Sequence, residues 1–534
     1  MKFFLPLLFS AVLLTSIDSV SFAQIRGVHP SGQKISEVFT YIDRMYVDSV
    51  EHEEISDAAI IAMLEALDPH STYIPAEEVK SANERIEGSF VGVGIRFQIL
   101  KDTLSVVNCV PNGPSDKVGI RPGDKIITVD NENIAGIGLK NTDVRNMLLG
   151  EKDTKVKITV IRKGKRRPIN FTITRDKIPM NSVISHYMVD DKVGYIKLTN
   201  FSKTTAEEVE SALKDLKEQG MEDLIFDLQG NTGGLLFAAK DVVDEFLKDK
   251  KLIVYSEGRV QPRAELRADS AGNFEAGRLV ILIDEGSASA SEIVAGAIQD
   301  WDRGLIVGRR SFGKGLVQRP IELSDGSQIR LTIARYYTPS GRFIQKPYDD
   351  LESYRKDRHE RFISGQLTHQ DSIKFADSLA YKTKINERIV YGGGGIMPDI
   401  FVALDTSEYS DYYKKISRAG VINAFTADYV DQNRSKITKN HEDLEAFIRD
   451  FEMDNAFMDE FFAFCEAEDS SLVFVAEDYE ISKEILQLRL KAMIAQSIWD
   501  YTAFYQIINP KNEIFQRAYD ILKEDEYDSK NLKY

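Results

Sequence analysis

Three serines clustered at residues 286–292, Gly-Ser-Ala-Ser-Ala-Ser-Glu, are of a type and spacing that could do chemistry. The cluster follows the apolar run LVILID and begins the helical stretch ASEIVAGAIQD, so a strand is expected to turn into a helix there. Free backbone N–H groups at a helix start can stabilise an oxyanion, which suits a nucleophilic serine. Ser289-x-x-Glu292 is equally a capping box, and helix capping alone explains a serine at this place. The local sequence leaves both hypotheses open, since one residue can cap and react.

A serine nucleophile needs a base, and the histidines are poorly placed to supply it. Of the seven, only His186 falls between residues 180 and 345, and it precedes the first strand of that region. A Ser-His-Asp triad is therefore hard to assemble, and no His-Glu-x-x-His pattern offers a zinc site. A lysine can act instead if burial lowers its pKa from about 10.4 toward neutrality, a shift of roughly three units or about 4 kcal/mol. Lys314, between Gly313 and Gly315 and next to apolar residues, suits that role.

The same lysine also ends a pattern that resembles a phosphate-binding loop, Gly-x-x-x-x-Gly-Lys from Gly308 to Lys314. A P-loop needs Ser or Thr after the lysine and a helix next, whereas Gly315 follows and residues 316–337 have the pattern of strand, turn and strand. The acidic strand LVILIDE precedes this loop, although the magnesium-binding strand normally follows it. These departures predict that the chain binds no nucleotide.

The elements that must position these residues follow an alternating pattern. Strand and helix alternate over residues 176–345, which predicts an α/β core with a largely parallel sheet. Before it, from Gly88 to about Arg175, short strands separated by turns surround one helix, TDVRNMLLG. Two short helices are expected over residues 34–66, and the end of the chain has helical apolar spacing. Residues 346–391 are charged, have no convincing period and are predicted to be an irregular insertion.

Composition and the first residues restrict location and partners. The chain of 534 residues is too long for one hydrophobic core, and its net charge of −16 argues against a nucleic acid or an anionic membrane as partner. Residues 1–23 have one lysine, an apolar run and a small-x-small site at Ser21–Ala23, which predicts a cleavable secretory signal peptide. We therefore expect an exported protein, periplasmic or otherwise outside the cytoplasm. An export signal also weakens the nucleotide hypothesis.

Residues 88–175 resemble a PDZ domain, most clearly in PSDKVGIRPGDKIITVDNENI. The resemblance implies that the VGVGI segment is the loop in which backbone N–H groups hold a peptide C-terminus. Taken alone, the VGVGI segment has a simpler explanation, in which its two glycines only allow a tight turn. The residues implied in binding the substrate C-terminus are Val91, Gly92, Val93, Gly94 and Ile95.

From about Leu67 to Val402 the chain resembles the carboxy-terminal processing peptidases, also called tail-specific proteases. The resemblance is carried in order by LDPHSTYIP, GSFVGVGI, the PDZ segment, DLQGNTGGLL, GSASASEIVAGAIQD, SFGKGLVQ and ARYYTPSGRFIQ. It implies Ser289 as nucleophile, Lys314 as base and Gln318 as the residue that orients Lys314. It further implies oxyanion donors at Ala290 and in the turn of Gly233 and Gly234, and an acidic position of uncertain role at Asp300. Two departures, Gln229 and Thr232, stand where the family usually has Arg and Pro, which puts the rigidity of that turn in question.

Taken together, the sequence predicts a multidomain α/β serine endopeptidase that recognises protein C-termini through its PDZ domain and needs no cofactor or metal. The main alternative is an inactive PDZ scaffold. The presence of both Ser289 and Lys314 argues against it. Expected partners are proteins or peptides with free C-termini, with an adaptor or a second copy of the chain as further candidates. The expected domains are a signal peptide (1–23), an N-terminal helical segment (24–85), a PDZ domain (86–176), a crotonase/ClpP-like α/β protease core (177–403, with the insertion 346–391) and a C-terminal α-helical domain (404–534).

Overall fold

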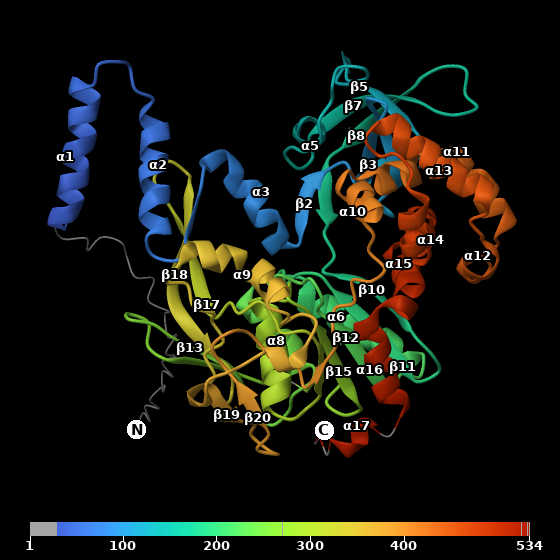
Figure 1. Cartoon of the computed structure of the whole chain (residues 1–534). Coiled ribbons are helices and arrows are strands. Elements are labelled where there is room, and N and C mark those ends of the chain that lie inside the picture. Colours follow the sequence, from blue (N-terminus) through green and yellow to red (C-terminus); the bar gives the residue numbers. More distant parts are fainter. Residues whose placement is uncertain (1–28, 270, 525, 531, 533–534) are drawn as a thin grey trace, which may run out of the picture. The chain divides into compact units, whose positions relative to one another are not determined.

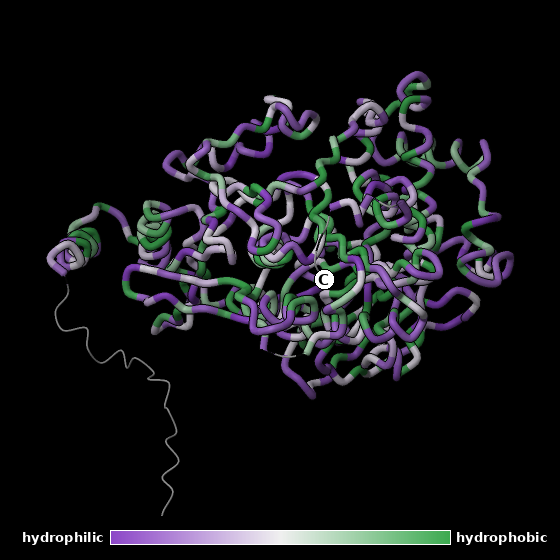
Figure 2. The backbone as a smooth tube through the Cα atoms, turned by 90° about the horizontal axis from the view of Figure 1, so that it is seen from below, coloured by the Kyte–Doolittle hydropathy of each residue, from purple (hydrophilic) through white to green (hydrophobic). Residues whose placement is uncertain are grey.

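The structure, a computed structural model, describes residues 29–269, 271–524, 526–530 and 532, and it divides into the units 1–66 and 67–534. The signal peptide predicted for residues 1–23 lies outside the described residues. The first unit holds the two expected helices, α1 (Pro30–Met45) and α2 (His52–Glu65), whose hydrophobic residues are green in Figure 2. Within these helices only Leu64 is buried. No helix among the described residues is both long and apolar enough to span a membrane.

The second unit begins with β1 (Thr72–Ile74) and α3 (Ala76–Glu87), followed by the predicted PDZ domain. The PDZ sheet has the strand order β3-β4-β5-β7-β8, with β6 pairing β5, and every pair is antiparallel. Side chains of β4, β5 and β7 face one core, which α5 closes with Val144. The elements are β2 (Ser89–Gly92), β3 (Ile95–Leu100), β4 (Thr103–Cys109), α4 (Pro114–Lys117), β5 (Lys125–Val129), β6 (Glu132–Asn133), α5 (Asn141–Leu148), β7 (Lys155–Ile161), β8 (Ile169–Thr174) and β9 (Asp176–Pro179).

The α/β core is built on a sheet with the strand order β10-β11-β12-β15-β16-β21, parallel except for the β10–β11 pair (Figure 1). Side chains of β11, β12, β15 and β16 enter two separate cores, so the central part of the sheet is buried on both faces. Helices α6, α7 and α8 contribute to one core, and α16 contributes to the other. The elements are β10 (Val183–Met188), β11 (Val193–Leu198), α6 (Thr205–Glu218), β12 (Asp223–Asp227), α7 (Leu236–Asp244), β15 (Leu279–Ile283), α8 (Ala290–Asp300), β16 (Leu305–Gly308), β21 (Ile400–Phe401) and α16 (Glu513–Lys523).

A second sheet with the order β1-β18-β13-β14, in which β17 also pairs β18, carries the strand and hairpin around Lys314. The segment 346–391 is not irregular as expected, because it contains the helix α9, whose first turn Asp350 caps by accepting from the backbone N–H of Glu352 and Ser353. Its charges hid the period, since few of its side chains are buried. The elements are β13 (Leu252–Glu257), β14 (Ala264–Arg267), β17 (Leu316–Glu322), β18 (Gln328–Tyr337), α9 (Leu351–Ile363), β19 (Ala380–Lys382) and β20 (Ile389–Tyr391).

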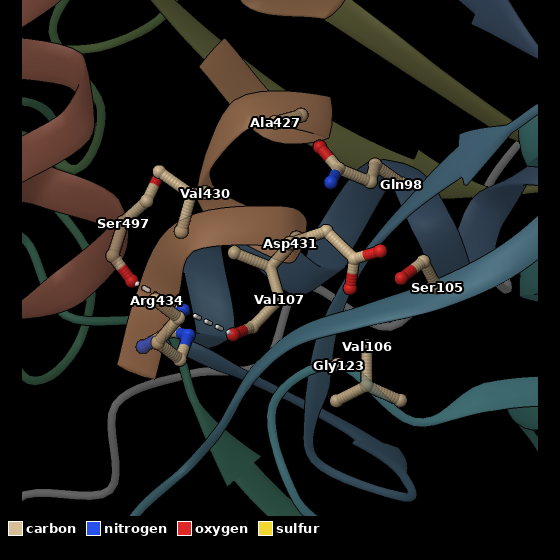
Figure 3. Close-up of a pocket in the computed structure, with 10 residues that line it drawn as sticks. All are labelled: Gln98, Ser105, Val106, Val107, Gly123, Ala427, Val430, Asp431, Arg434 and Ser497. Carbon is tan, nitrogen blue, oxygen red and sulfur yellow. Dashed lines mark hydrogen bonds between the residues drawn. The ribbon is translucent and has the colours of Figure 1, made fainter. Parts of the chain in front are cut away.

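The C-terminal helices form an aromatic-rich core of their own, except for α16 and α17, which contribute to the core against the protease sheet instead. The predicted boundary at residue 404 therefore does not separate all of the C-terminal helices from the core. In Figure 3, Arg434 of α11 donates to the carbonyl of Val107 in the PDZ domain at 3.2 Å and to that of Ser497 at 2.8 Å. The remaining elements are α10 (Asp411–Arg418), α11 (Val421–Asn440), α12 (Leu444–Asp450), α13 (Asn455–Glu468), α14 (Ala476–Ile498), α15 (Tyr501–Ile508) and α17 (Glu526–Ser529).

Candidate active site

Ser289 lies between the end of β15 and the start of α8, and its environment differs from that of the two neighbouring serines. The Ser287 hydroxyl donates to the Leu228 carbonyl at 2.8 Å, and the Ser291 hydroxyl donates to the Asn231 carbonyl at 2.8 Å; both side chains are fully buried. Ser289 is half-buried, and within the described part of the chain its hydroxyl donates no hydrogen bond. Its φ of 55° and ψ of −110° are strained for a residue with a Cβ, a condition typical of functional positions.

Glu292 links the backbone of Ser289 to the loop that carries Lys314. The predicted capping box is confirmed, with the Ser289 N–H donating to Glu292 at 2.8 Å. The same fully buried carboxylate also accepts from the Ser311 hydroxyl at 2.6 Å and from the N–H groups of Gly313 and Lys314 at 2.7 and 2.9 Å. Burial raises the pKa of Glu292, and these donors oppose that shift. Sequence reasoning treated Glu292 as a helix cap and missed this wider role.

Lys314 follows β16 and precedes β17, and its ammonium group is held by Gln318. The Nζ atom donates to Gln318 Oε1 at 3.1 Å, which brings together the two residues that the family resemblance paired. The register of β17 against β18 shifts between Val317 and Gln318. Burial lowers the pKa of Lys314, opposed by the charges of Glu292 and Asp68 and assisted by Arg330. Lys314 thus has the desolvated surroundings that a neutral amine needs.

A buried tyrosine fixes the two backbone segments against one another. The Tyr336 hydroxyl donates to the carbonyl of Ser289 at 3.0 Å and also contacts the carbonyl of Lys314. Its side chain is almost wholly buried, at 1% exposure. Tyr336 lies within the ARYYTPSGRFIQ motif, yet nothing in that motif predicts that one hydroxyl reaches both carbonyls.

The turn of Gly233 and Gly234 lies against Ser289, but its two N–H groups differ. A Cβ on Gly233 would come within 2.8 Å of the Ser289 Cβ and 2.9 Å of the Ala290 nitrogen, which shows how closely the turn approaches. The Gly233 N–H donates to Asn231 Oδ1 at 2.9 Å, so in this arrangement that N–H group is engaged within the turn. Within the described residues the N–H groups of Gly234 and Ala290 donate to no acceptor. These two remain as candidate oxyanion donors.

Gln229, which stands where the family usually has Arg, makes hydrogen bonds to both the core and the C-terminal segment. Its backbone N–H donates to Asp227 at 2.7 Å, and its side-chain amide donates to the same carboxylate at 3.2 Å. Asn512, which caps α16, donates to the Gln229 side-chain oxygen at 3.4 Å. The Lys197 ammonium completes the group by donating to Asp227 at 2.9 Å and to the Gln229 carbonyl at 2.7 Å. The turn is therefore braced where it leaves β12. Thr232 is exposed.

Asp300, the acidic position of uncertain role, pairs with Arg342 at 2.5 Å, and both side chains are fully buried. It also accepts from the Ser340 N–H at 2.8 Å. These contacts hold the TPSGRFIQ segment against the end of α8 and are structural. Among the described residues, no group of three or more His, Cys, Asp or Glu side chains is arranged to hold a metal ion.

The segment 67–75 enters the site, although it lies outside residues 180–345, the region in which a base is expected. Gln318 donates its amide to the carbonyl of His70, and His70 Nε2 lies 2.7 Å from the Tyr354 hydroxyl of α9. Burial, together with the nearby Lys314 charge, lowers the pKa of His70 to about 4, so its ring is neutral near pH 7. The LDPHSTYIP motif was the one signal that could have indicated this.

The VGVGI segment runs from β2 through a short loop into β3, an edge strand of the PDZ sheet. The Val93 carbonyl accepts from the N–H and hydroxyl of Ser115 at 3.0 and 2.7 Å, and the Gly94 carbonyl accepts from the Val110 N–H at 2.9 Å. In the part of the chain that the structure describes, the N–H groups of Val93 and Gly94 have no acceptor. This arrangement leaves donors for a carboxylate next to a strand edge that can pair with a peptide.

Comparisons with known proteins agree with this geometry. Residues 192–351 match the model of peptidase family S41, residues 91–173 match that of the PDZ domain, and residues 412–500 match a family of unknown function (DUF8443). The chain is 32% identical over 366 residues to the carboxy-terminal processing protease CtpA of Bacillus subtilis, covering 66% of this chain and 78% of that protein. It is 34% identical over 341 residues to the carboxy-terminal-processing protease of Bartonella bacilliformis, covering 63% and 77%.

Among solved structures, the photosystem II D1 C-terminal processing protease is 30% identical, with a TM-score of 0.34 and coverage of 59% of this chain and 90% of that one. The family match spans Ser289, Lys314 and Gln318, and the extent and identity of the similarity to the curated relatives decide the assignment. The chain belongs to peptidase family S41, as a PDZ-containing serine peptidase of the carboxy-terminal processing type.

Proposed function

We propose that the chain is an exported, periplasmic endopeptidase that captures the C-terminus of a protein substrate in its PDZ domain and cleaves with a Ser289–Lys314 dyad. The observation that carries the dyad is the contrast within the serine cluster. Only Ser289 keeps a hydroxyl that donates to no described residue, and its backbone shares the Glu292 carboxylate with the desolvated Lys314.

In the proposed reaction, neutral Lys314 takes the proton of the Ser289 hydroxyl as the oxygen attacks the substrate carbonyl carbon. The N–H groups of Ala290 and Gly234 donate to the resulting oxyanion. Lys314 then gives its proton to the leaving amine, the C–N bond breaks, and an acyl-enzyme remains. Water attacks this ester by the same route, with Lys314 again as base, which frees the carboxylic acid and restores Ser289. Gln318 accepts a hydrogen bond from Nζ and so directs its lone pair.

Alanine substitution within the serine cluster tests the assignment. Ser289→Ala should abolish cleavage of dye-labelled β-casein, while the lost cap costs only about 1 kcal/mol of stability. Ser287→Ala and Ser291→Ala are matched controls that remove the same hydroxyl two residues before and after Ser289, and each should retain cleavage. Loss of cleavage in either control, with Ser289→Ala active, would place the nucleophile elsewhere in the cluster. Failure of the unaltered protein to cleave would reject the dyad proposal in favour of an inactive scaffold.

Capture by the PDZ domain rests on the free N–H groups of Val93 and Gly94. Amidation of a peptide C-terminus removes the negative charge that these donors would receive. A peptide with a free C-terminal carboxylate should therefore inhibit casein cleavage by competition or stimulate cleavage of a short reporter peptide. The same peptide with an amidated C-terminus should do neither. Equal effects of the two peptides would reject carboxylate capture.

The location proposal rests on the sequence of residues 1–23 alone. Expression of the full chain in its host, followed by fractionation and N-terminal sequencing, should recover a protein that begins near Gln24 outside the cytoplasm. Recovery of an intact N-terminus in the cytoplasmic fraction would refute export.

A further inference from the structure

Gln318 is held from a part of the chain 248 residues away. Its side-chain oxygen accepts from Lys314 Nζ at 3.1 Å, and its side-chain nitrogen donates to the carbonyl of His70. A carboxamide has one acceptor oxygen and one donor nitrogen, so the His70 carbonyl decides which end faces the lysine. If the amide turned over, it would present N–H groups to the ammonium. The orientation of the carbonyl of His70 is therefore part of the environment of the base.

Asp68 fixes that carbonyl. Its Oδ1 atom accepts from the N–H groups of His70 and Ser71 at 2.8 and 2.9 Å, and its Oδ2 atom accepts from the Ser71 hydroxyl at 2.7 Å. An aspartate that bonds the backbone two and three residues ahead closes a turn of one shape. Asp68 is 6% exposed and Ser71 is 4% exposed, so water offers these groups little competition.

The same turn is joined to the strand that faces Lys314. Thr332 of β18 donates its hydroxyl to Asp68 Oδ1 at 3.1 Å, and its backbone N–H donates to the Ser71 hydroxyl at 3.1 Å. β1 continues this contact by pairing antiparallel with β18, from Thr72 opposite Arg330. Because Gln318 pairs with Thr332 across β17 and β18, the turn and the amide it orients share one support.

A third contact comes from α9 in the segment 346–391. The His70 ring meets the Tyr354 hydroxyl at 2.7 Å and packs edge-on against the Tyr354 ring, with centroids 5.5 Å apart. Lys346 Nζ lies 4.2 Å from the centre of the same tyrosine ring. The segment thus contacts the turn through the His70 side chain.

We propose that the turn Asp68–Ser71 is a positioning element for the base, with Asp68 as the residue that holds the His70 carbonyl in place to orient Gln318 on Lys314. Asp68 acts through other residues and does not touch the reacting atoms. The proposal rests on the proposed dyad, because a turn that orients Lys314 matters to turnover only if Lys314 transfers the proton.

The charge of Asp68 gives a second, separable readout. Lys314 faces Glu292 of α8, Arg330 of β18 and, in the turn, Asp68 and His70. Asp68 raises the pKa of Lys314, so its removal should lower that pKa further. If Gln318 loses its orientation, kcat falls. If the Asp68 charge is lost, the pKa of Lys314 falls and the acid limb of the kcat–pH profile moves to lower pH. General unfolding does neither to the remaining folded molecules.

The experiment uses the full mature chain with dye-labelled β-casein. Asp68→Ala should lower kcat at least tenfold with KM within threefold of the unaltered protein, and should shift the acid limb downward. Asp68→Asn, which keeps an oxygen for the backbone N–H groups, should recover part of kcat but show the same shift. Asp325→Asn is the control: Asp325 accepts from the N–H and hydroxyl of Ser327 in the β17–β18 turn, away from Gln318, and the variant should change neither quantity.

Thr332→Val provides a variant that keeps the side-chain shape on β18 if Asp68→Ala does not fold. It removes one donor to Asp68, and we expect a roughly threefold lower kcat with no shift of the limb. Unchanged kcat and an unmoved limb in all folded variants would overturn the proposal.

Acetylation of Lys314 separates this proposal from the dyad itself. The rate at which acetic anhydride acetylates Lys314, measured from pH 6 to 11 by mass spectrometry of its peptide, reports the lysine pKa without any substrate. A lower midpoint in Asp68→Asn than in Asp325→Asn supports the influence of Asp68 on Lys314, even where casein cleavage survives Ser289→Ala and the dyad proposal fails. Identical midpoints would overturn the influence of Asp68, whatever the outcome with Ser289→Ala.

Discussion

Replacement of Gly234 by alanine tests the oxyanion assignment most directly. Gly234 has a φ of +151°, and a Cβ placed there would lie 2.0 Å from the Phe201 carbonyl oxygen and 2.8 Å from its carbon. The Phe201 carbonyl cannot yield easily, because it accepts from the Leu235 N–H at 2.9 Å while the Phe201 N–H donates to Gly233 at 3.0 Å. Since real Cβ atoms essentially never approach within 3.0 Å, the turn itself must move by about 1 Å or more.

Such a movement takes the Gly234 N–H away from the oxyanion that forms when Ser289 attacks the substrate carbonyl. Loss of one oxyanion donor costs about 10²–10³ in kcat, or about 2.7–4 kcal/mol of transition-state stabilisation. KM should change little, because the donor acts on charge that develops only in the transition state. The left-handed strain adds about 1–3 kcal/mol to the cost in stability. We therefore expect Gly234→Ala to fold with a lower melting temperature and to turn over casein about 100-fold more slowly.

Gly230→Ala is the matched control in the same turn. Gly230 also has a positive φ, +68°, but a Cβ there meets nothing within 4 Å, so the variant has backbone strain without the clash. Its kcat for dye-labelled β-casein should stay within threefold of the unaltered protein, with both variants checked for folding by circular dichroism. If folded Gly234→Ala also keeps kcat within threefold, Gly234 donates nothing to the transition state and the reasoning is refuted.

Further predictions concern the base, the buried ion pair and the PDZ contact. Lys314→Arg should be as inactive as Lys314→Ala, because a guanidinium keeps its proton at working pH, and retained cleavage would indicate a purely electrostatic role. Burial lowers the pKa of Lys314, and the proposed base is its neutral form, so kcat should fall as pH decreases through that pKa, with a midpoint below about 10.4. A profile flat from about pH 5 to 10 would contradict this. Asp300→Asn should destabilise the protease core by about 3–5 kcal/mol in urea unfolding by leaving the charge of Arg342 buried and unpaired, and an unchanged midpoint would show the pair to be dispensable. Arg434→Ala should increase amide exchange in β4 of the PDZ domain by removing its bonds to two carbonyls, whereas unchanged exchange would mean that other contacts hold this face.

The parts of the fold that the sequence predicted are those with a short-range pattern. Strands of the core show continuous apolar runs such as LVILI, because helices cover both faces of the sheet, and the helices show apolar spacing on the face they bury. The two residues of the proposed dyad were predicted for a related reason. Ser289 follows a strand and Lys314 lies in a glycine-flanked loop, and the family resemblance then paired them with Gln318.

What the sequence did not reveal depends on contacts between distant segments. Neither α9 nor the packing of α16 follows from composition, since α9 is mostly exposed and α16 covers a sheet face whose need for a cover appears only once the sheet is assembled. Likewise, His70 lies outside residues 180–345, the region in which a base is expected, yet the pairing of β1 with β18 brings it to Gln318. The hydrogen bond from the Gly233 N–H to Asn231 depends on the rotamer of Asn231, and no sequence pattern predicts that rotamer.

The structure offers a physical explanation for the two departures from the family pattern, Gln229 and Thr232, in the turn that holds Gly234. A proline at position 232 would stiffen the turn by fixing φ, and this chain has Thr232 instead. Stiffness is supplied here by Asn231, whose side chain donates to the Leu198 carbonyl at 3.1 Å and accepts from the Gly233 N–H, and by Gln229 through Asp227. Because Asn512 donates to Gln229, the C-terminal segment that lies beyond the family match supports the turn that holds the candidate oxyanion donor. Truncation before Asn512 should therefore impair turnover as well as stability, since it removes both the cover of the sheet and one of the supports of this turn.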